Sequence, residues 1–139
     1  MVPPILSVLL VSEHDVVLAR QRARALAARL GFDRHDETRV ATAVSEIARN
    51  AVNYGGGGKV EFGVDPTPGG QALVITVSDK GRGIANLAQV LEGRFRSSTG
   101  MGQGIAGARR LMDGFDIATS LRGTRVILRK NLPQRAPPV

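Results

Sequence analysis

The sequence predicts a two-layer α/β sandwich in which helices pack against a largely antiparallel sheet. Two segments, residues 16–30 and 41–54, carry apolar residues at three- and four-residue steps, as amphipathic helices do. Two pairs of β-branched segments are each joined by a short polar turn, which favours antiparallel hairpins over parallel strands with crossover helices. A chain of 139 residues fits one domain, to which we assign residues 1–130.

A predicted strand at residues 5–11 is followed by the first of these two helices. The strand segment is rich in Val, Leu and Ile. Ser12 is the expected helix cap, and the acidic Glu13 and Asp15 come next, where the positive end of the helix dipole favours them. Gly31 ends this helix, since glycine readily adopts the conformation of a C-terminal cap.

The second helix, residues 41–54, carries two polar residues of chemical interest. Residues 33–36 offer caps for its start, and the four glycines 55–58 end it. Glu46 and Asn50 lie one turn apart beside its apolar stripe, so that a carboxylate and a carboxamide can reach one small volume. The stripe consists of Val40, Ala43, Val44, Ile47, Ala48, Ala51 and Val52.

Spacing alone leaves two interpretations of this pair open. The amide oxygen of Asn50 can bind Mg2+, a cation that prefers oxygen ligands and keeps several waters. The carboxylate of Glu46 can then take a proton from an attacking hydroxyl. Alternatively, Glu46, Arg49, Asn50 and Asn53 form an ordinary solvated helix face, as polar residues of surface helices do by default.

A further carboxylate is predicted at the end of a central strand. Residues 59–64 and 72–77 form the first hairpin, with a turn at residues 65–70. Asp79 leaves the second of these strands and is followed by a Gly-x-Gly sequence. This order places a carboxylate at a sheet edge above a tight backbone turn, although a plain turn at a strand end would look the same.

Two glycine-rich segments invite a phosphate-binding interpretation. A P-loop at residues 57–59 is excluded, because the motif needs Gly at 53 and Ser or Thr at 60, where the chain has Asn53 and Val60. The segment 100–104, Gly-Met-Gly-Gln-Gly, opens a helix running to about residue 112. Glycines at a helix start let N–H groups approach an anion, and the helix dipole favours phosphate there. A plain turn is the alternative.

The remaining segments connect the sheet and complete it. Residues 86–91 are predicted as a short helix and residues 92–99 as a mobile loop. Residues 115–120 and 124–128 form the second predicted hairpin. The proline-rich residues 131–139 are predicted to be a disordered tail.

Composition restricts the classes of function. The chain has no Cys, so it has no disulfide, thiolate metal site or thiol nucleophile. No apolar run approaches the roughly 18 residues of a membrane span, and we expect a cytoplasmic protein that does not bind membranes. The net charge of +7 suggests a nucleic-acid partner. However, aromatic residues make up only 4% and the arginines are dispersed, so we expect no binding of nucleic acid. An anionic ligand or an acidic protein partner suits the charge better.

Taken in order, these motifs resemble a known family. Residues 46–50 match the N box, residues 79–84 the G1 box and residues 100–105 the G2 box of the GHKL ATP-binding family, whose Bergerat fold occurs in gyrase B and histidine kinases. Within it, the chain is most similar to the small serine/threonine kinases of bacterial anti-sigma factor switches, of the RsbT type. The resemblance covers roughly residues 5–130. It implies a mixed, mostly antiparallel sheet with helices on one face.

The resemblance also implies ATP and Mg2+ as cofactors. Asn50 would hold Mg2+ at the phosphates, and Glu46 would take the proton of the protein hydroxyl that is phosphorylated. Asp79 would accept the adenine amino hydrogen, directly or through a water shared with Thr124. The G2 glycines would cradle the phosphates under a lid at residues 94–99. The implied nucleotide-binding residues are Asn50, Asp79, Gly81, Gly83, Ile84, Gly100, Met101, Gly102, Gln103, Gly104, Ile105 and Thr124.

The chain departs from the family pattern at three positions. Tyr54 occupies a position where many members have His or Lys, although the RsbT type accepts an aromatic residue there. Lys80 and Arg82 add positive charge to the predicted adenine loop, where acidic residues or Pro are common.

The implied function is that of a protein serine/threonine kinase. It would phosphorylate a STAS-domain switch or scaffold protein in a stressosome-like assembly, and so regulate a sigma factor pathway. The RsbT type also implies binding and activation of a downstream phosphatase. The alternative is an anti-sigma factor that sequesters its target, with ATP as a structural ligand. The catalytic part of a sensor histidine kinase is less expected, because no phospho-acceptor helix pair precedes the domain.

Overall fold

The computed structural model describes residues 2–84, Leu87, Leu91 and residues 101–133, with side chains described from Gly104 to Leu132 in the last range. In chain order, the elements are β1 (Leu6–Leu10), α1 (Glu13–Leu30), α2 (Arg34–Tyr54), β2 (Gly58–Thr67), β3 (Gly70–Asp79), α4 (Met101–Leu111), β4 (Gly114–Ser120) and β5 (Gly123–Pro133). Both predicted hairpins are present, as β2–β3 and β4–β5.

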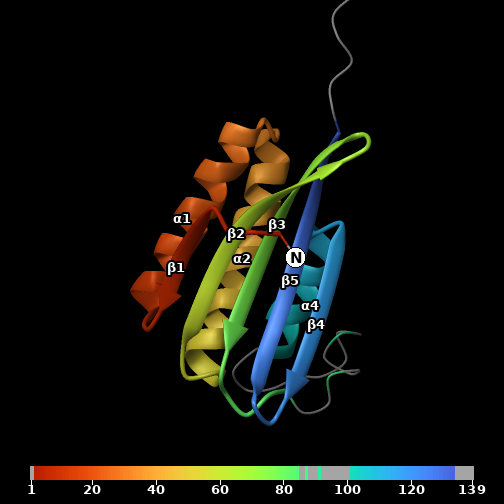
Figure 1. The fold of residues 1–139 in the computed structure, drawn as a ribbon. Coiled ribbons are helices and arrows are strands. Elements are labelled where there is room, and N and C mark those ends of the chain that lie inside the picture. Colours follow the sequence, from red (N-terminus) through yellow and green to blue (C-terminus); the bar gives the residue numbers. More distant parts are fainter. Residues whose placement is uncertain (1, 85–86, 88–90, 92–100, 134–139) are drawn as a thin grey trace, which may run out of the picture.

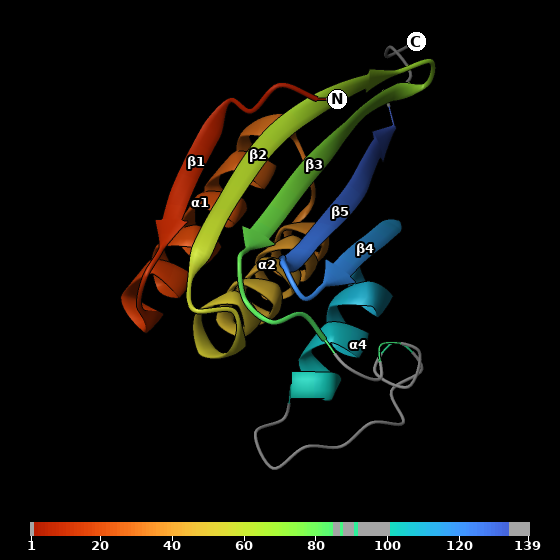
Figure 2. The same cartoon turned by 60° about the horizontal axis from the view of Figure 1, so that its bottom comes forward.

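The five strands form one sheet in the order β1-β2-β3-β5-β4. Figures 1 and 2 show α1, α2 and α4 together on one face of this sheet. The predicted sandwich with helices on one face is therefore confirmed. All four strand pairings of the described residues are antiparallel, so this part of the sheet lacks the parallel pairing that a mixed sheet would contain.

Helix α1 has the predicted cap Ser12 and the predicted end at Gly31, but it begins at Glu13, three residues before the predicted start. The carboxylate of Asp15 accepts hydrogen bonds from the backbone N–H groups of Val11 at 2.8 Å and Ser12 at 3.1 Å. These two bonds hold the pKa of Asp15 below its ordinary value, since they favour the ionised carboxylate. Gly31 ends the helix with φ 102°, the left-handed conformation expected of a glycine cap.

Helix α2 lies behind the centre of the sheet and supplies much of the core (Figure 1). The Asp33 carboxylate caps it by accepting a bond from the N–H of Asp36 at 2.8 Å. The predicted apolar stripe is buried, except that Val52 is half-buried. The stripe packs against Phe62, Leu73, Ile75 and Leu128 of the sheet, all of which are fully buried. Burial of each such side chain contributes about 1.5–3 kcal/mol.

The first hairpin is longer than predicted. Residues 65–67 and Gly70, which were assigned to the turn, belong to the strands, because residues 65–67 pair with residues 70–72. Only Pro68 and Gly69 connect the strands. Pro66 is tolerated within β2 because the pairing with β1 stops at Phe62. Beyond that residue, the outer edge of β2 has no strand partner in the described part of the chain.

The predicted tail also begins too early. Residues 131–133 pair with Gly70, Gln71 and Ala72 of β3, so they extend β5 instead of forming a disordered tail. Residues 134–139 lie outside the described part. So do the predicted loop and lid at 92–99 and most of the predicted helix at 86–91, of which only Leu87 and Leu91 are described, both helical. None of the helices described is both long and apolar enough to cross a membrane.

Candidate nucleotide-binding site

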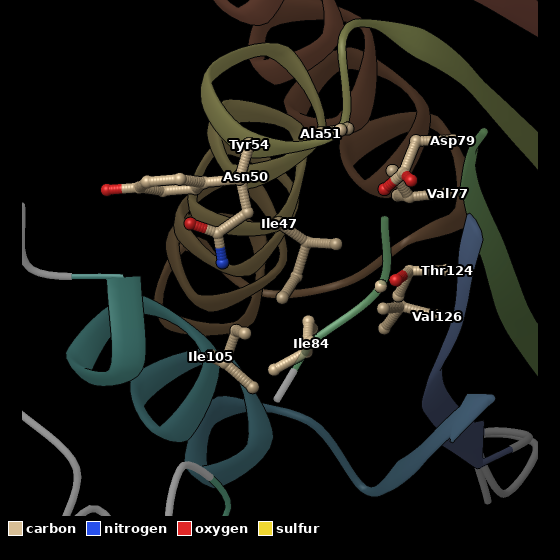
Figure 3. A pocket seen from close by; sticks show the side chains of 12 residues that line it. Ile47, Asn50, Ala51, Tyr54, Val77, Asp79, Ile84, Ile105, Thr124 and Val126 are labelled. Atoms are coloured by element: carbon tan, nitrogen blue, oxygen red, sulfur yellow. The ribbon is translucent and has the colours of Figure 1, made fainter. Parts of the chain in front are cut away.

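The site lies where β3 and β4 end and β5 begins, beside α2. Asp79 pairs with Thr124 in the β3–β5 register, and Thr124 pairs with Thr119 in the β4–β5 register. These three residues therefore form one row across the sheet, on the side that faces the helices. Figure 3 shows Asn50 and Tyr54 of α2 opposite Asp79 and Thr124, with the pocket between them.

The pocket combines residues from five segments of the chain. Six predicted nucleotide-binding residues line it: Asn50, Asp79, Gly83, Ile84, Ile105 and Thr124. Six further residues complete the lining: Ile47, Ala51, Tyr54, Gly55, Val77 and Val126. The pocket volume is about 30 Å³, room for only one or two waters. Ile84 and Ile105 point toward one another at its lower side in Figure 3, so an adenine ring can enter only if such side chains shift.

The carboxylate of Asp79 is held in a fixed orientation. Its Oδ1 atom accepts a hydrogen bond from the N–H of Gly81 at 2.9 Å. On the other side lies Gly55, where an added Cβ would stand 2.6 Å from Oδ2. The Oδ2 atom accepts no hydrogen bond from the described residues, so it can accept one from an amino group in the pocket.

A hydroxyl chain fixes the turn that follows Asp79. The N–H of Ile84 donates to Oγ1 of Thr119 at 2.8 Å, and the hydroxyls of Thr119 and Thr124 lie 2.8 Å apart. Gly83, at φ 84°, lies so close to the carbonyl of Ser120 that a Cβ would overlap it. Glycine is therefore required at this point of the adenine loop predicted from the G1 box.

Thr119 was not predicted as a site residue, although the sequence held a signal for it. The predicted hairpin with a short turn near residues 121–123 places Thr119 opposite Thr124 once the register is known. Gly55 was predicted only as a helix terminator, and its contact with Asp79 depends on the fold. The apolar wall residues Ile47 and Val126 were predicted only as parts of a buried helix face and a strand.

Asn50 has the property expected of a ligand-binding amide. Its Nδ2 atom is buried and has no hydrogen-bond partner among the described residues. The two ends of a carboxamide are interchangeable by rotation, so either its oxygen or its nitrogen can face the pocket. An unpaired buried polar group costs about 1–3 kcal/mol, which a bound ligand or cation would recover. The residue therefore fits the predicted role at a magnesium nucleotide.

Glu46 lies beside the pocket lining, one turn before Asn50, and faces α4. An added Cβ on Gly104 would stand 2.8 Å from its Oε2 atom. Its Oε1 atom lies 3.5 Å from Nη1 of Arg49. The Glu46 carboxylate and the start of α4 are thus neighbours, as convergence on one phosphate would require.

The G2 segment is described in part. Helix α4 begins at Met101, so Gly102, Gln103 and Gly104 lie in its first turn. The first N–H groups of a helix have no partner within it and bear partial positive charge, which favours an anion. Gly100 and the side chains of residues 101–103 lie outside the described part. The backbone of the start of α4 is thus compatible with a phosphate.

The described residues contain no cluster of three His, Cys, Asp or Glu side chains that could hold a metal ion. Mg2+ keeps several waters and is often held by one or two protein groups together with substrate phosphates. A magnesium ion here would therefore depend on Asn50, on waters and on a nucleotide. The donor set fits magnesium bound with ATP and does not fit magnesium bound alone.

The positive residues Lys80 and Arg82 lie outside the small pocket. They line a wider groove of about 860 Å³, together with Lys59 and the glycines 55–58. The groove shares Tyr54, Gly55 and Asp79 with the pocket. The departure from the family pattern thus places charge beside the Asp79 end of the pocket and not within it.

Comparison with known proteins gives the chain its family. The family described as histidine kinase-like ATPase domain matches residues 11–130. The serine/threonine-protein kinase RsbT of Bacillus subtilis (strain 168) is 40% identical over 108 residues, which are 78% of this chain and 81% of RsbT.

Solved structures share the fold. The structure of the RsbU and RsbW domains of Rv1364c from Mycobacterium tuberculosis superposes with a TM-score of 0.67 and 24% identity over 99% of this chain. Full-length ShkA in complex with AMPPNP superposes with a TM-score of 0.58 and 21% identity, also over 99% of this chain. The chain spans only 34% and 32% of these longer proteins. At these identities, the likeness shows the fold alone.

The residues matched by the family run from the start of α1 to Lys130 in β5. They therefore include all the residues that line the pocket. The similarity to RsbT, which is a serine/threonine-protein kinase, covers most of both chains. The chain therefore belongs to the histidine kinase-like ATPase family, the GHKL family, and within it to the serine/threonine protein kinases of the RsbT type.

Proposed function

We propose that this kinase uses Mg-ATP to phosphorylate a Ser or Thr hydroxyl of a STAS-domain switch protein, and so regulates a sigma factor pathway. The observation that carries the proposal is the meeting of three distant segments at one site. Asn50 and Asp79 line one pocket, and Glu46, one turn from Asn50, contacts the start of α4 at Gly104. Phosphoryl transfer depends mainly on positioning and charge neutralisation, so these few groups suffice.

Each group has a defined task in this proposal. Asp79 accepts a hydrogen bond from the adenine amino group through Oδ2, because Gly81 already occupies Oδ1. Asn50 holds magnesium through its amide oxygen. Glu46 accepts the proton of the acceptor hydroxyl, because its Oε2 atom faces the start of α4. ATP, when bound, supplies the phosphoryl group.

The partner is proposed from family membership together with the site. RsbT-type kinases are expected to act on STAS-domain antagonist or scaffold proteins in a stressosome-like assembly. The same membership suggests a second role, in which the released kinase binds and activates a downstream phosphatase. A chain with net charge +7 suits partners with acidic surfaces.

A phosphate-transfer assay tests the proposal. Labelled ATP and Mg2+ are incubated with this protein and a purified STAS-domain protein from the same genome. We expect label on a Ser or Thr, lost in Glu46→Gln, while calorimetry shows that the variant still binds Mg-ATP. The matched control is Glu61→Gln, whose side chain projects from the sheet face opposite the helices and should leave transfer unchanged.

Two outcomes would contradict the proposal. Absence of heat with Mg-ATP at millimolar concentration would exclude the nucleotide site. Binding of ATP without transfer to any STAS-domain protein would instead favour an anti-sigma factor that sequesters its target and uses ATP as a structural ligand.

A further inference from the structure

Arg49 bridges two carboxylates from different helices. Its Nη1 atom lies 3.5 Å from Oε1 of Glu46, one turn earlier on α2. Its Nε atom donates to Oε1 of Glu13 at 3.3 Å, and Glu13 is the first residue of α1. Arg49 and Glu13 are 36 residues apart, so this contact depends on the packing of α1 against α2.

The two oxygens of Glu46 face different neighbours. Oε1 faces Arg49, whereas Oε2 faces Gly104 at the start of α4, where a Cβ would stand only 2.8 Å away. A cation on one oxygen limits rotation of the carboxylate and leaves the other oxygen directed at α4. In the proposed reaction, that second oxygen is the one that meets the acceptor hydroxyl.

We propose that Arg49 is a positioning residue for Glu46, with Glu13 as its anchor on α1. The proposal rests on the assignment of Glu46 as the general base. The guanidinium is suited to this task because its planar fork can engage two carboxylates at once. Arg49 need not touch ATP or the acceptor protein, because it acts only through the orientation of the Glu46 side chain.

Because the ion pairs of Arg49 lie at the surface, their effect on catalysis can be distinguished from an effect on stability. The side chains of Arg49, Glu46 and Glu13 are 40%, 35% and 58% exposed. Ion pairs at such exposure contribute little to stability. Catalysis is more sensitive, since a misplacement of about 1 Å can reduce the rate about 100-fold. Loss of Arg49 should therefore slow the reaction and spare the fold.

Steady-state kinetics of phosphate transfer test the proposal. In Arg49→Met we expect kcat to fall about 10- to 100-fold, while the KM for ATP and the unfolding temperature stay near the wild-type values. Arg49→Lys should recover part of the loss, because lysine restores the charge but not the fork. Glu13→Gln should lower kcat less than Arg49→Met, and adding it to Arg49→Met should cause no further loss.

Arg39→Met is the matched control for these variants. Arg39 lies on the same helix and pairs with Asp36 three residues earlier, at 2.8 Å, as Arg49 pairs with Glu46. This variant should retain the wild-type kcat. The positioning role is overturned if Arg49→Met retains the wild-type kcat, or if it loses no more activity than Arg39→Met.

A measurement without substrate separates this inference from the proposed function. The side-chain carboxyl resonance of Glu46 in labelled protein should shift in Arg49→Met and stay unchanged in Arg39→Met. An unchanged resonance in Arg49→Met overturns the positioning role whether or not the protein phosphorylates anything. If the wild-type protein transfers no phosphate, the proposed function fails, and the resonance shows separately whether Arg49 orients the carboxylate.

Discussion

Gly104 determines how closely α4 approaches the Glu46 carboxylate. In Gly104→Ala, the new methyl group would stand 2.8 Å from Oε2, closer than Cβ atoms approach non-bonded atoms in proteins, so one of the two groups must move. The carboxylate is the free end of a flexible side chain, so it can move away at little cost in stability. We expect kcat for phosphate transfer to fall about tenfold or more, with ATP affinity by calorimetry nearly unchanged.

Gly107→Ala provides the control for this variant. Gly107 lies on the same helix, and an added Cβ there meets no atom within 4 Å. It should preserve activity and slightly stabilise the helix, since alanine favours helix more than glycine. If Gly104→Ala keeps the wild-type activity, the Glu46 carboxylate can move without loss of phosphate transfer. This result would contradict the role of Glu46 as a base that must be held in position.

Thr119 connects the predicted adenine loop to the sheet through a single oxygen. Thr119→Val keeps the shape of the side chain but removes the acceptor of the Ile84 N–H and the partner of the Thr124 hydroxyl. We expect a loss of about 1–3 kcal/mol in the free energy of unfolding, with weaker ATP binding because the loop is no longer fixed. Urea unfolding measures the change in stability, and calorimetry measures the change in ATP binding. Thr76→Val is the control, because Thr76 lies on the face of β3 opposite the helices.

The sequence predicted those parts of the site whose residues are close together in the chain. It did not predict contacts between residues that are far apart in the chain. Glu46 and Asn50 share one side of a helix by spacing alone. The contact of Glu46 with Gly104 joins residues of two helices, and the bond from Ile84 to Thr119 spans 35 positions. Such contacts follow from packing and strand register, which periodicity does not specify.

At the scale of elements, a buried lysine joins two helices to the sheet. Nζ of Lys130 on β5 donates to the carbonyl of Leu111, the last residue of α4, at 3.0 Å. It also lies 3.6 Å from Asp36 in the first turn of α2 and 3.7 Å from Asp113. The lysine side chain is only 9% exposed, so these neighbours replace the water that its ammonium group would otherwise contact.

Replacement of this lysine should therefore destabilise the protein. Lys130→Met keeps the length of the side chain but leaves the Leu111 carbonyl without its donor, and we expect a loss of about 1–3 kcal/mol. Lys59→Met is the control, because Lys59 is 52% exposed and its pair with Glu61 is on the surface. Equal urea midpoints for the two variants would show that the buried contacts contribute nothing.

Lys130 also explains why the end of β5 could not be predicted. The polar pair Lys130 and Asn131 is not typical of a strand, and the prolines beyond it suggested a tail. In the fold, the Lys130 side chain is paired and the N–H of Asn131 donates to Asp113 at 2.7 Å. Tertiary contacts thus satisfy groups that, in the sequence alone, indicate a solvent-exposed segment.

At the scale of the whole molecule, the hairpins were predicted but their order in the sheet was not. Strand β5 lies between β3 and β4, so the chain passes from β3 through α4 to the edge strand β4 and then returns. Helical and strand periodicities are local and carry no information about this order. It is this return that brings Thr124 next to Asp79 and so completes the site.

The length of β5 gives a test of how the last residues contribute to the molecule. A chain ending after Lys130 loses the pairing of residues 131–133 with β3, the bond from Asn131 to Asp113, and the packing of Leu132 on the core. We expect its free energy of unfolding to fall by at least about 2 kcal/mol, because one hydrogen bond and part of a leucine side chain already account for that amount before the lost pairing is added.

A chain ending after Pro133 keeps all of these contacts and is the matched control. Its unfolding temperature should equal that of the full chain, whereas the shorter form should unfold several degrees lower, since about 1 kcal/mol corresponds to 2–8 °C for domains of this size range. Both forms retain Asp79 and Thr124, so Mg-ATP affinity should be preserved at temperatures where both are folded. Equal unfolding temperatures for the two truncations would mean that residues 131–133 add no stability, because the ladder formed by residues 123–130 already fixes β5 between β3 and β4.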